Sequence, residues 1–445
     1  MEPTDRSTIS VSEQERLPVL DLLRGVAILM ILPANLPLFS FTDPLFHEKK
    51  LIGLDKVLYG LTLFLIYGKF ITLLSILFGA GLAIQAERAE AKGVPFRSYY
   101  IRRLGVLLLL GLIHGIVFWY GDVLALYALV GIIAMLLTPL DQRALLRLVK
   151  VLLAWCYFCL LLIFVSVLLA QWANRTFQQF PQQTKVSAPL PSSPKGEPRA
   201  PEVKETERRR EQQRKAAEEF GRKIGEYFSV RNQIRIYREG GWKEKVLNNL
   251  LFFSGMICCF VPWLIGPYVL ACFLFGMYLY RLRGFADIAA HQSFFTKWQK
   301  IGFGVGIPVH IVSLALLFLT SSVAVPNLFV GFGAFFQSVA YLATLALWSR
   351  QNFCPWLLER LRAVGRLALT NYLLQTLICT FIFYGNGLGL AGQWSLTQVF
   401  SLVPVMWLFH LLISPVWLGH FSIGPVEWLW RSLSEGRRRP FLRRS

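Results

Sequence analysis

Charged residues are scarce in this sequence, and so are the signatures of soluble enzymes. Only 16% of its 445 residues are Asp, Glu, Lys or Arg, whereas 55% are apolar. No P-loop is present, no GxGxxG motif opens a helix after a strand, and no HExxH metal motif occurs. A chain this apolar cannot cover itself with a polar surface. The composition therefore excludes a soluble enzyme.

Cysteine is also sparse, and its positions do not indicate redox chemistry or zinc binding. Six of the seven cysteines lie within apolar runs, where cysteine usually serves as a small hydrophobic residue. Cys156 and Cys159 form a CxxC pair, but it falls in the middle of an apolar segment and no second pair accompanies it. We expect neither redox chemistry nor zinc binding there, and no metal elsewhere.

The sequence instead contains many separate apolar runs, each long enough to cross a bilayer. We predict an all-α polytopic membrane protein of about ten transmembrane helices, with eleven as the alternative. The polar stretch before 247–280 is expected outside the cytoplasm and the basic loop after it inside, so an odd number of crossings must separate them. We therefore predict one broken, re-entrant or tilted segment in this region, near Pro262 and Pro267. Residues 1–18 show no signal-peptide pattern, so we expect the first span to be an uncleaved anchor.

Basic residues outnumber acidic ones, 46 to 26, and they gather in short loops beside the apolar runs. By the positive-inside rule these loops face the cytoplasm, and we predict that both termini do so too. Anionic lipid headgroups of the bilayer account for the charge, and we assign no nucleic-acid partner. The predicted cytoplasmic loops are residues 87–103, 141–150, 281–300 and 350–366.

Composition divides the chain into five parts. A cytoplasmic tail (1–18) precedes an N-terminal transmembrane bundle (19–171). A polar insert (172–246) follows, which we expect to lie outside the cytoplasm and to be partly disordered, partly helical. A second transmembrane bundle (247–433) leads to a basic cytoplasmic tail (434–445).

Two ionisable residues stand out in the apolar stretch Leu107–Gly131. His114 and Asp122 lie on two predicted helices joined by the very short turn Tyr120–Asp122. Ionisable groups in such a segment are costly and are functional candidates by default. The alternatives are a histidine satisfied by a neighbouring helix and an aspartate that only caps the second helix. The presence of both on one hairpin favours function.

Further polar groups fall at two depths. Asn35 closes the first span and Lys69 begins the second, so both should lie near the outer face with His114, which is about 17 Å along its helix from Arg103 at 1.5 Å per residue. Asp21 and Arg24 fall at the inner face beside Arg102 and Arg103. One end thus resembles a buried reactive site, and the other resembles an entrance for anions.

Four sequence blocks resemble the YeiB-like family of bacterial membrane proteins. They are residues 20–35, 68–88, 111–131 and 365–390, the last continuing through 414–433. The family resembles, in turn, a superfamily of transmembrane acyltransferases that includes heparan-α-glucosaminide N-acetyltransferase and the OafA-type enzymes. The resemblance implies transfer of an acyl group from cytoplasmic acyl-CoA, with acetyl-CoA as the first choice, to an envelope glycan or lipid acceptor. It also makes a homodimer plausible.

The resemblance also bears on individual residues. In the heparan enzyme, an Asn closing the first span and a His about a dozen residues later are the proposed catalytic pair, and Asn35 and His47 have a comparable spacing here. His114, Asp122 and Tyr127, however, belong to the YeiB-like pattern, whereas a histidine at position 47 does not. We therefore rank His114 above His47.

The residues suit acyl transfer on chemical grounds. His114 could act as the base, with Asp122 fixing its tautomer. Asn35 or Lys69 could donate a hydrogen bond to the developing oxyanion. Asn371 and Gln375, one turn apart, could line the substrate tunnel or could equally form hydrogen bonds between helices. Four arginines on the inner side could bind the phosphates of CoA: Arg24, Arg102, Arg103 and Arg366.

The leading hypothesis is therefore a membrane acyltransferase that modifies a sugar hydroxyl or amine. The alternative is a transporter or permease for a small anionic or amphipathic solute, which the polar groups at both faces would also suit. A third possibility is a non-catalytic partner of an envelope enzyme. For the 172–246 insert two roles are open. It is either a tolerated linker or an element of the outer surface that binds an acidic glycan or a lipid headgroup.

Overall fold

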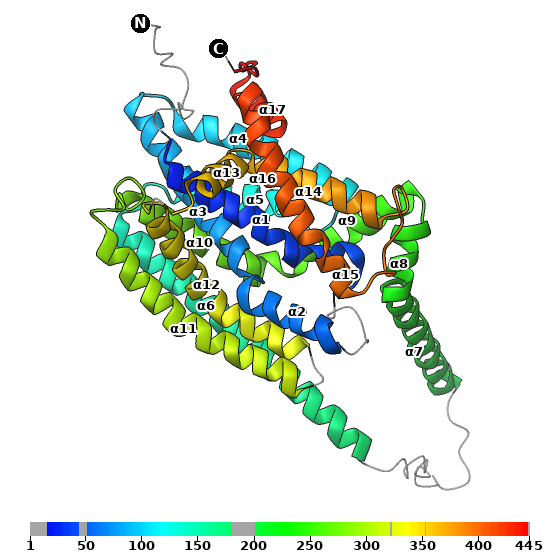
Figure 1. Ribbon diagram of the computed structural model, residues 1–445. Helices are drawn as coiled ribbons and strands as arrows, with labels where there is room; N and C mark the ends of the chain where they lie inside the picture. The colour runs from blue at the N-terminus through cyan, green and yellow to red at the C-terminus, as the bar shows by residue number, and fades with distance from the viewer. Residues whose placement is uncertain (1–15, 44–50, 180–200, 321–322, 352, 444–445) are drawn as a thin grey trace, which may run out of the picture.

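The structure, a computed structural model, describes residues 16–43, 51–179, 201–320, 323–351 and 353–443. It is a bundle of α-helices (Figure 1). The described residues form no β-strand, and their single isolated bridge pairs Phe421 with Leu442 near the C-terminal end. The prediction of an all-α polytopic membrane protein is confirmed.

Eight helical stretches of the described chain are long and apolar enough to cross a membrane. They are α1 (Pro18–Ser40); α2 (Gly53–Leu65) with α3 (Lys69–Ala91); α4 (Phe96–Ile113) with the π-helical turn η1 (His114–Phe118); α6 (Gln142–Gln179); η2 (Val261–Ile265) with α10 (Gly266–Arg281); α11 (Gln292–Leu319); α12 (Ala324–Trp348); and α15 (Leu396–Phe400) with α16 (Leu402–His420).

The remaining two predicted spans have counterparts that differ from a simple crossing. Helix α5 (Leu124–Leu136) has 13 residues, or about 20 Å at 1.5 Å per residue, which is less than the roughly 30 Å of a hydrocarbon core. Helices α13 (Pro355–Arg366) and α14 (Ala368–Phe383) meet at an angle of 82°, so they count as a ninth span only if the bent pair is one crossing. The described residues thus contain eight candidate spans, or nine if the bent pair is one crossing, with α5 as a shorter apolar helix beside them.

The predicted break in 247–280 is present as the π-helical turn η2 between α9 (Trp242–Cys259) and α10. Pro262 and Pro267 bear no backbone N–H, which removes donors from the regular helical ladder at this point. Only residues Val261–Arg281 of this region qualify as a span. Helix α9 instead lies at the end of the bundle opposite the start of α1, together with the insert.

The two predicted bundles share one hydrophobic core, because helices from both halves cross at glycines. A Cβ atom on Gly25 of α1 would lie 1.9 Å from the Leu361 carbonyl oxygen of α13, and one on Gly365 would lie 1.8 Å from the Asp21 carbonyl oxygen. No side chain fits either position. Glycine thus allows α1 and α13 to touch backbone to backbone, as small residues do in membrane helix packing.

Helices α3 and α10 make a second crossing of the same kind. A Cβ atom on Gly79 would meet the Phe273 carbonyl oxygen at 1.9 Å, and one on Gly276 would meet that of Ile76 at 1.8 Å. The N-terminal and C-terminal halves are therefore in close backbone contact at two helix crossings, each with a glycine on both helices, and do not pack as separate units.

The polar insert leaves the bundle and returns to it. Helix α6 continues to Gln179, so the first residues of the region predicted to be disordered are helical; residues 180–200 lie outside the described part of the chain. Helix α7 (Pro201–Tyr227) projects away from the bundle (Figure 1). Helix α8 (Val230–Glu239) then packs back, burying Ile236 and Tyr237 completely. The insert thus caps one end of the molecule.

Candidate functional site

His114 lies where helix α4 changes to a π-helical turn. The turn covers His114–Phe118 and ends at Trp119, whose backbone is extended. Such π-turns inside helices frequently mark functional sites. After Tyr120 and Asp122 the chain enters α5, so the tight hairpin expected from the sequence is present. His114 faces the turn of this hairpin.

The hairpin brings His114 and Asp122 into direct contact. Nδ1 of His114 lies 2.8 Å from Oδ1 of Asp122, and both residues are buried, with 3% and 2% of their surface exposed. The second carboxylate oxygen of Asp122 accepts a hydrogen bond of 2.7 Å from the backbone N–H of Ala125. Asp122 therefore both caps the start of α5 and pairs with the histidine, which combines the two predicted roles.

The opposite nitrogen of the imidazole contacts helix α14. Nε2 of His114 lies 2.9 Å from the hydroxyl oxygen of Thr376. One turn earlier on α14, the ring of Tyr372 lies 5.2 Å from the imidazole, measured between centroids. The sequence alone did not single out Thr376 or Tyr372, because threonine and tyrosine in an apolar helix have no distinctive spacing.

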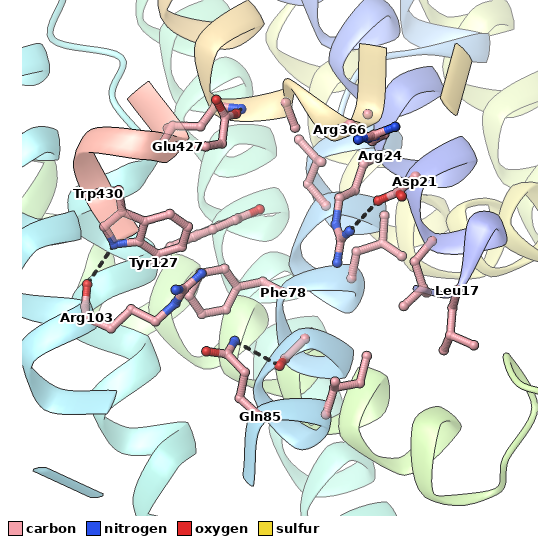
Figure 2. A pocket seen from close by; sticks show the side chains of 18 of the residues that line it. Leu17, Asp21, Arg24, Phe78, Gln85, Arg103, Tyr127, Arg366, Glu427 and Trp430 are labelled. Atoms are coloured by element: carbon pink, nitrogen blue, oxygen red, sulfur yellow. Dashed lines mark hydrogen bonds and ion pairs between the residues drawn. The ribbon is translucent and has the colours of Figure 1, made fainter. Parts of the chain in front are cut away.

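A cavity of about 390 Å³ opens at the end of the bundle where α1 begins (Figure 2). Its volume lies within the range of about 300–1,000 Å³ typical of ligand sites. Its walls come from both halves of the chain, and its apolar part includes Leu77, Phe78 and Leu107. Seven arginines line it: Arg16, Arg24, Arg88, Arg103, Arg283, Arg366 and Arg431.

Among the described residues, two carboxylates line the cavity beside these seven cations, and both are engaged. Asp21 accepts a hydrogen bond of 2.9 Å from Arg24, its neighbour one turn later on α1. Glu427, on α17 (Pro425–Glu435), accepts hydrogen bonds from the backbone N–H groups of Leu369 and Thr370 at 2.7 and 3.0 Å. Burial raises the pKa of Glu427 above its usual range, and these bonds oppose that shift. The described lining of the cavity therefore carries an excess of positive charge.

Arg431 shows the cost of this crowding. Withdrawal from water, reinforced by the neighbouring charges of Arg103, Arg16 and Arg439, lowers the pKa of Arg431 to about 9. The guanidinium is still cationic at neutral pH, but in an unfavourable setting. Arg103 itself is held in place: its guanidinium stacks 3.7 Å from the ring of Trp430. A bound anion would relieve the repulsion between these groups.

The deep end of the cavity reaches the residues beside the His114–Asp122 pair. Val123, which follows Asp122, and Tyr372, which contacts His114, both line the cavity. His114 and Asp122 themselves do not. On the side toward the α8 cap stands Trp119, which is 1% exposed, stacks on Phe39 at 4.2 Å and has its indole ring 6.4 Å from the imidazole. The buried pair is thus closed from both directions.

The structure separates the predicted arginines. Arg24, Arg103 and Arg366 line the cavity, as does Tyr127, whose hydroxyl lies 2.7 Å from that of Ser75. Arg102 is exposed on the outside of α4 and does not line it. The sequence missed the contributions of Arg16, Arg88, Arg283 and Arg431, although most of them lie in or beside the basic loops that were recognised.

Asn35 and Lys69 occupy positions other than those expected. Helix α1 continues past Asn35 to Ser40, so this half-buried residue does not end the span. Lys69 starts α3 as predicted and is fully buried, but its ammonium group donates a hydrogen bond to the Leu63 carbonyl at the end of α2. Neither lines the cavity. His47 lies outside the described residues.

Asn371 and Gln375 link helices. The side-chain amide of Asn371 donates to the Val364 carbonyl and to the Ser414 hydroxyl, both at 3.1 Å. Gln375 donates to the Ile28 carbonyl of α1 at 3.1 Å. Both are buried, and neither lines the cavity. Their geometry corresponds to the interhelical alternative.

These features define the class of protein: a multi-pass, all-helical membrane protein with an arginine-lined cavity at one end and a buried His–Asp pair beyond it. Residues 279–437 match the family described as a protein of unknown function, DUF418. The chain is 29% identical to protein YxaH of Bacillus subtilis, over 94% of each chain, and 28% identical to protein YeiB of Escherichia coli, over 94% of this chain and 96% of that one.

The chain is thus similar to YeiB and YxaH over nearly its whole length, which confirms the resemblance seen in its motifs. A further relative, a 39.9 kDa protein encoded beside an amylase gene of Bacillus acidopullulyticus, is 24% identical over 97% of both chains. The names of these relatives assign them no activity. No solved structure matches the chain.

Proposed function

We propose that this protein is a membrane acyltransferase that takes an acyl group from acyl-CoA and passes it to an acceptor on the other side of the bilayer. The observation that supports this most is the position of the arginine-lined cavity, whose deep end reaches Val123 and Tyr372, the neighbours of the His114–Asp122 pair. A binding site for a polyanionic donor and a base for acyl transfer thus lie next to each other, with Tyr372 between them.

The donor is proposed to bind with its phosphates among the arginines. Guanidinium groups make strong, often bidentate hydrogen bonds to phosphate. Burial, reinforced by repulsion from neighbouring arginines, lowers the pKa of Arg431, and phosphate charge nearby would offset both effects. The pantetheine arm and acyl group would extend along the apolar wall toward Tyr372, and acetyl-CoA is the first candidate among donors.

The chemistry is proposed to take place at His114. With Asp122 accepting from Nδ1, the other ring nitrogen, which contacts the Thr376 hydroxyl at 2.9 Å, has a lone pair that can accept a proton from a nucleophilic hydroxyl or amine. Such a base contributes roughly 10²–10⁴-fold to a rate. Asn35 and Lys69, which we considered as oxyanion donors, lie away from the cavity and are not assigned this role.

The orientation follows from charge. Basic loops favour the cytoplasmic side of a bacterial inner membrane, which places the arginine end and both termini inside. The acceptor, a sugar hydroxyl or amine of an envelope glycan or lipid, would then approach from the α8 side.

The first experiment measures thermal stability of the purified, detergent-solubilised protein with acetyl-CoA, longer acyl-CoAs, CoA and pyrophosphate. We expect stabilisation by every CoA species in the wild type and in Arg102→Gln, whose side chain is exposed outside the cavity. Arg24→Gln should weaken binding by about 10-fold or more, because hydrogen bonds to charged groups contribute roughly 1.5–3 kcal/mol. The two arginine variants form a matched pair.

Release of CoA in the presence of envelope acceptors is the second measurement. Absence of both stabilisation and CoA release in folded protein would overturn the proposal. Stabilisation by a CoA species or by pyrophosphate without any thioester cleavage, combined with uptake of a small anion into proteoliposomes, would favour the transporter alternative. Equal losses in Arg24→Gln and Arg102→Gln would show that the cavity is not the binding site.

A further inference from the structure

We propose that Thr376 is the nucleophile of this site and carries the acyl group as a covalent threonyl ester between donor and acceptor. The inference rests on the proposed function, and it assigns a chemical role to a residue that no sequence motif indicated. Its basis is the contact of 2.9 Å between the Thr376 hydroxyl and Nε2 of His114, within the chain of contacts Thr376–His114–Asp122.

The hydrogen-bond partners determine where the protons lie. The Asp122 carboxylate only accepts, and one of its oxygens already accepts from Ala125 N–H. The other oxygen must therefore receive a proton from Nδ1 of His114. In a neutral imidazole Nε2 then carries a lone pair, so the Thr376 hydroxyl donates to it. This is the protonation state of a nucleophile, base and orienting carboxylate.

Thr376 also stands where an acyl donor would arrive. It lies four residues after Tyr372 on α14, about 6 Å further along the axis at 1.5 Å per residue, and Tyr372 lines the deep end of the cavity. The start of α14 is fixed by the hydrogen bonds that Glu427 accepts from Leu369 and Thr370. The hydroxyl is thus held on a positioned helix just behind the floor of the arginine-lined cavity.

The enclosure of the site explains the need for a carrier. Tyr372 separates His114 from the cavity, and Trp119 covers it on the side of the α8 cap. Thr376 Oγ1 occupies the hydrogen-bonding position at Nε2 that a directly activated acceptor would require. Donor and acceptor can therefore meet the base in turn, from opposite ends, if the acyl group stays on the protein between the two events.

The proposed reaction has two balanced halves. The Thr376 oxygen attacks the thioester carbonyl carbon, so that a C–O bond forms and the C–S bond breaks; the hydroxyl proton passes to His114 Nε2 and from there to the departing sulfur, releasing CoA as its thiol. The acceptor oxygen or nitrogen then attacks the carbonyl carbon of the threonyl ester, so that its bond to this carbon forms and the bond from this carbon to the Thr376 oxygen breaks. Its proton passes to Nε2 and on to the Thr376 oxygen, which restores the hydroxyl.

The test is acyl labelling without acceptor. Purified protein is mixed with isotope-labelled acetyl-CoA, denatured in acid and analysed by peptide mass spectrometry, while free CoA thiol is followed in parallel. We expect a burst of CoA release up to one equivalent per chain, with the label on Thr376. Thr376→Ser should still be labelled, whereas Thr376→Val and His114→Ala should lose at least about 100-fold in labelling rate.

Thr380→Val is the matched control, because Thr380 lies one turn further along α14, is also buried and donates to the Leu377 carbonyl instead of a histidine. It should label like the wild type. Thermal stability and stabilisation by CoA report that each variant is folded with an intact cavity.

Two failures are distinguishable. If the wild type releases CoA only when acceptor is present, and Thr376→Val does so at a similar rate, the threonyl ester is overturned and direct transfer by His114 stands. The same conclusion follows if the label is found on another residue. If folded wild-type protein cleaves no acyl-CoA with or without acceptors, both the proposed acyltransferase function and the proposed threonyl ester are overturned.

Discussion

The two ends of this molecule treat polar groups in opposite ways. At the α8 end, buried polar side chains bond mainly to one another: Gln233 with Asn248 at 2.7 Å and Tyr237 with Asn249 at 2.5 Å. At the arginine end, seven guanidinium groups face a cavity with two engaged carboxylates. Polar groups that satisfy each other hold a structure together, whereas an excess of one charge around a cavity is suited to a ligand of the opposite charge.

The largest effect should come from the pair that lies between the two ends. His114→Ala is expected to reduce acyl transfer about 10²–10⁴-fold, since it removes the base. Stabilisation by CoA should persist, because His114 does not line the cavity. Acyl transfer assays and thermal shifts on the same preparation separate the two results. His420→Ala, at an exposed histidine of α16, serves as control; an unchanged rate in His114→Ala would contradict the site.

The next effect concerns the crossing that builds the arginine end. Gly365→Ala would place a methyl group 1.8 Å from the Asp21 carbonyl oxygen, so α1 and α13 must move apart. Overpacking of this kind costs about 1–3 kcal/mol, and displacement of Arg24 and Arg366 should weaken CoA binding as well. Melting temperature and CoA titration provide the measurements.

Gly304→Ala on α11 is the matched control for this crossing, because a Cβ atom there meets nothing within 4 Å. It should melt like the wild type. Similar melting of both variants would show that the close contact between α1 and α13 is not needed.

A smaller effect is expected at Arg431, where a substitution should raise the stability of the ligand-free protein instead of lowering it. Arg431→Gln removes a guanidinium whose charge is disfavoured by burial and by repulsion from its neighbours, so the ligand-free protein should become more stable. CoA affinity should fall, by about 10-fold for the loss of one charged hydrogen bond. A purely structural arginine would give lower stability instead. Melting with and without CoA tests both signs, and a destabilised variant would contradict the charge-crowding argument.

The smallest effect should occur at the opposite end. Tyr237→Phe removes the hydroxyl that donates to Asn249 and should lower stability by about 1 kcal/mol, the typical net contribution of one hydrogen bond. CoA stabilisation and the labelling of Thr376 should be unchanged. Denaturation midpoints and CoA titration are the measurements, and a loss of CoA binding would show that the two ends are not independent.

The sequence predicted features that depend on neighbouring residues along the chain. Apolar runs revealed the spans, and the short turn between His114 and Asp122 brought those two side chains together, because residues on a tight hairpin have few other partners. Their rarity in an apolar setting marked them as candidates. The end of the bundle that carries the arginines followed from the basic loops.

Features that depend on packing between distant helices were not predictable. Arg102 and Arg103 differ by one position, so they point in directions about 100° apart, and only the packing of α17 against α4 decides which of them faces the cavity. Lys69 was placed at the correct helix start, but the carbonyl of Leu63 draws its side chain elsewhere. Thr376 met His114 across 262 residues of sequence, a pairing that no local pattern encodes.

Helix α17 couples these elements mechanically. Glu427 and Arg431 are one turn apart on this helix. Glu427 accepts hydrogen bonds from the first turn of α14, and Arg431 lines the cavity. Since a short helix moves as a rigid body, any force that draws Arg431 inward also pulls on the turn of α14 that precedes Tyr372. The hydrogen bonds of Glu427 thus determine how much of a displacement at the mouth of the cavity reaches its floor.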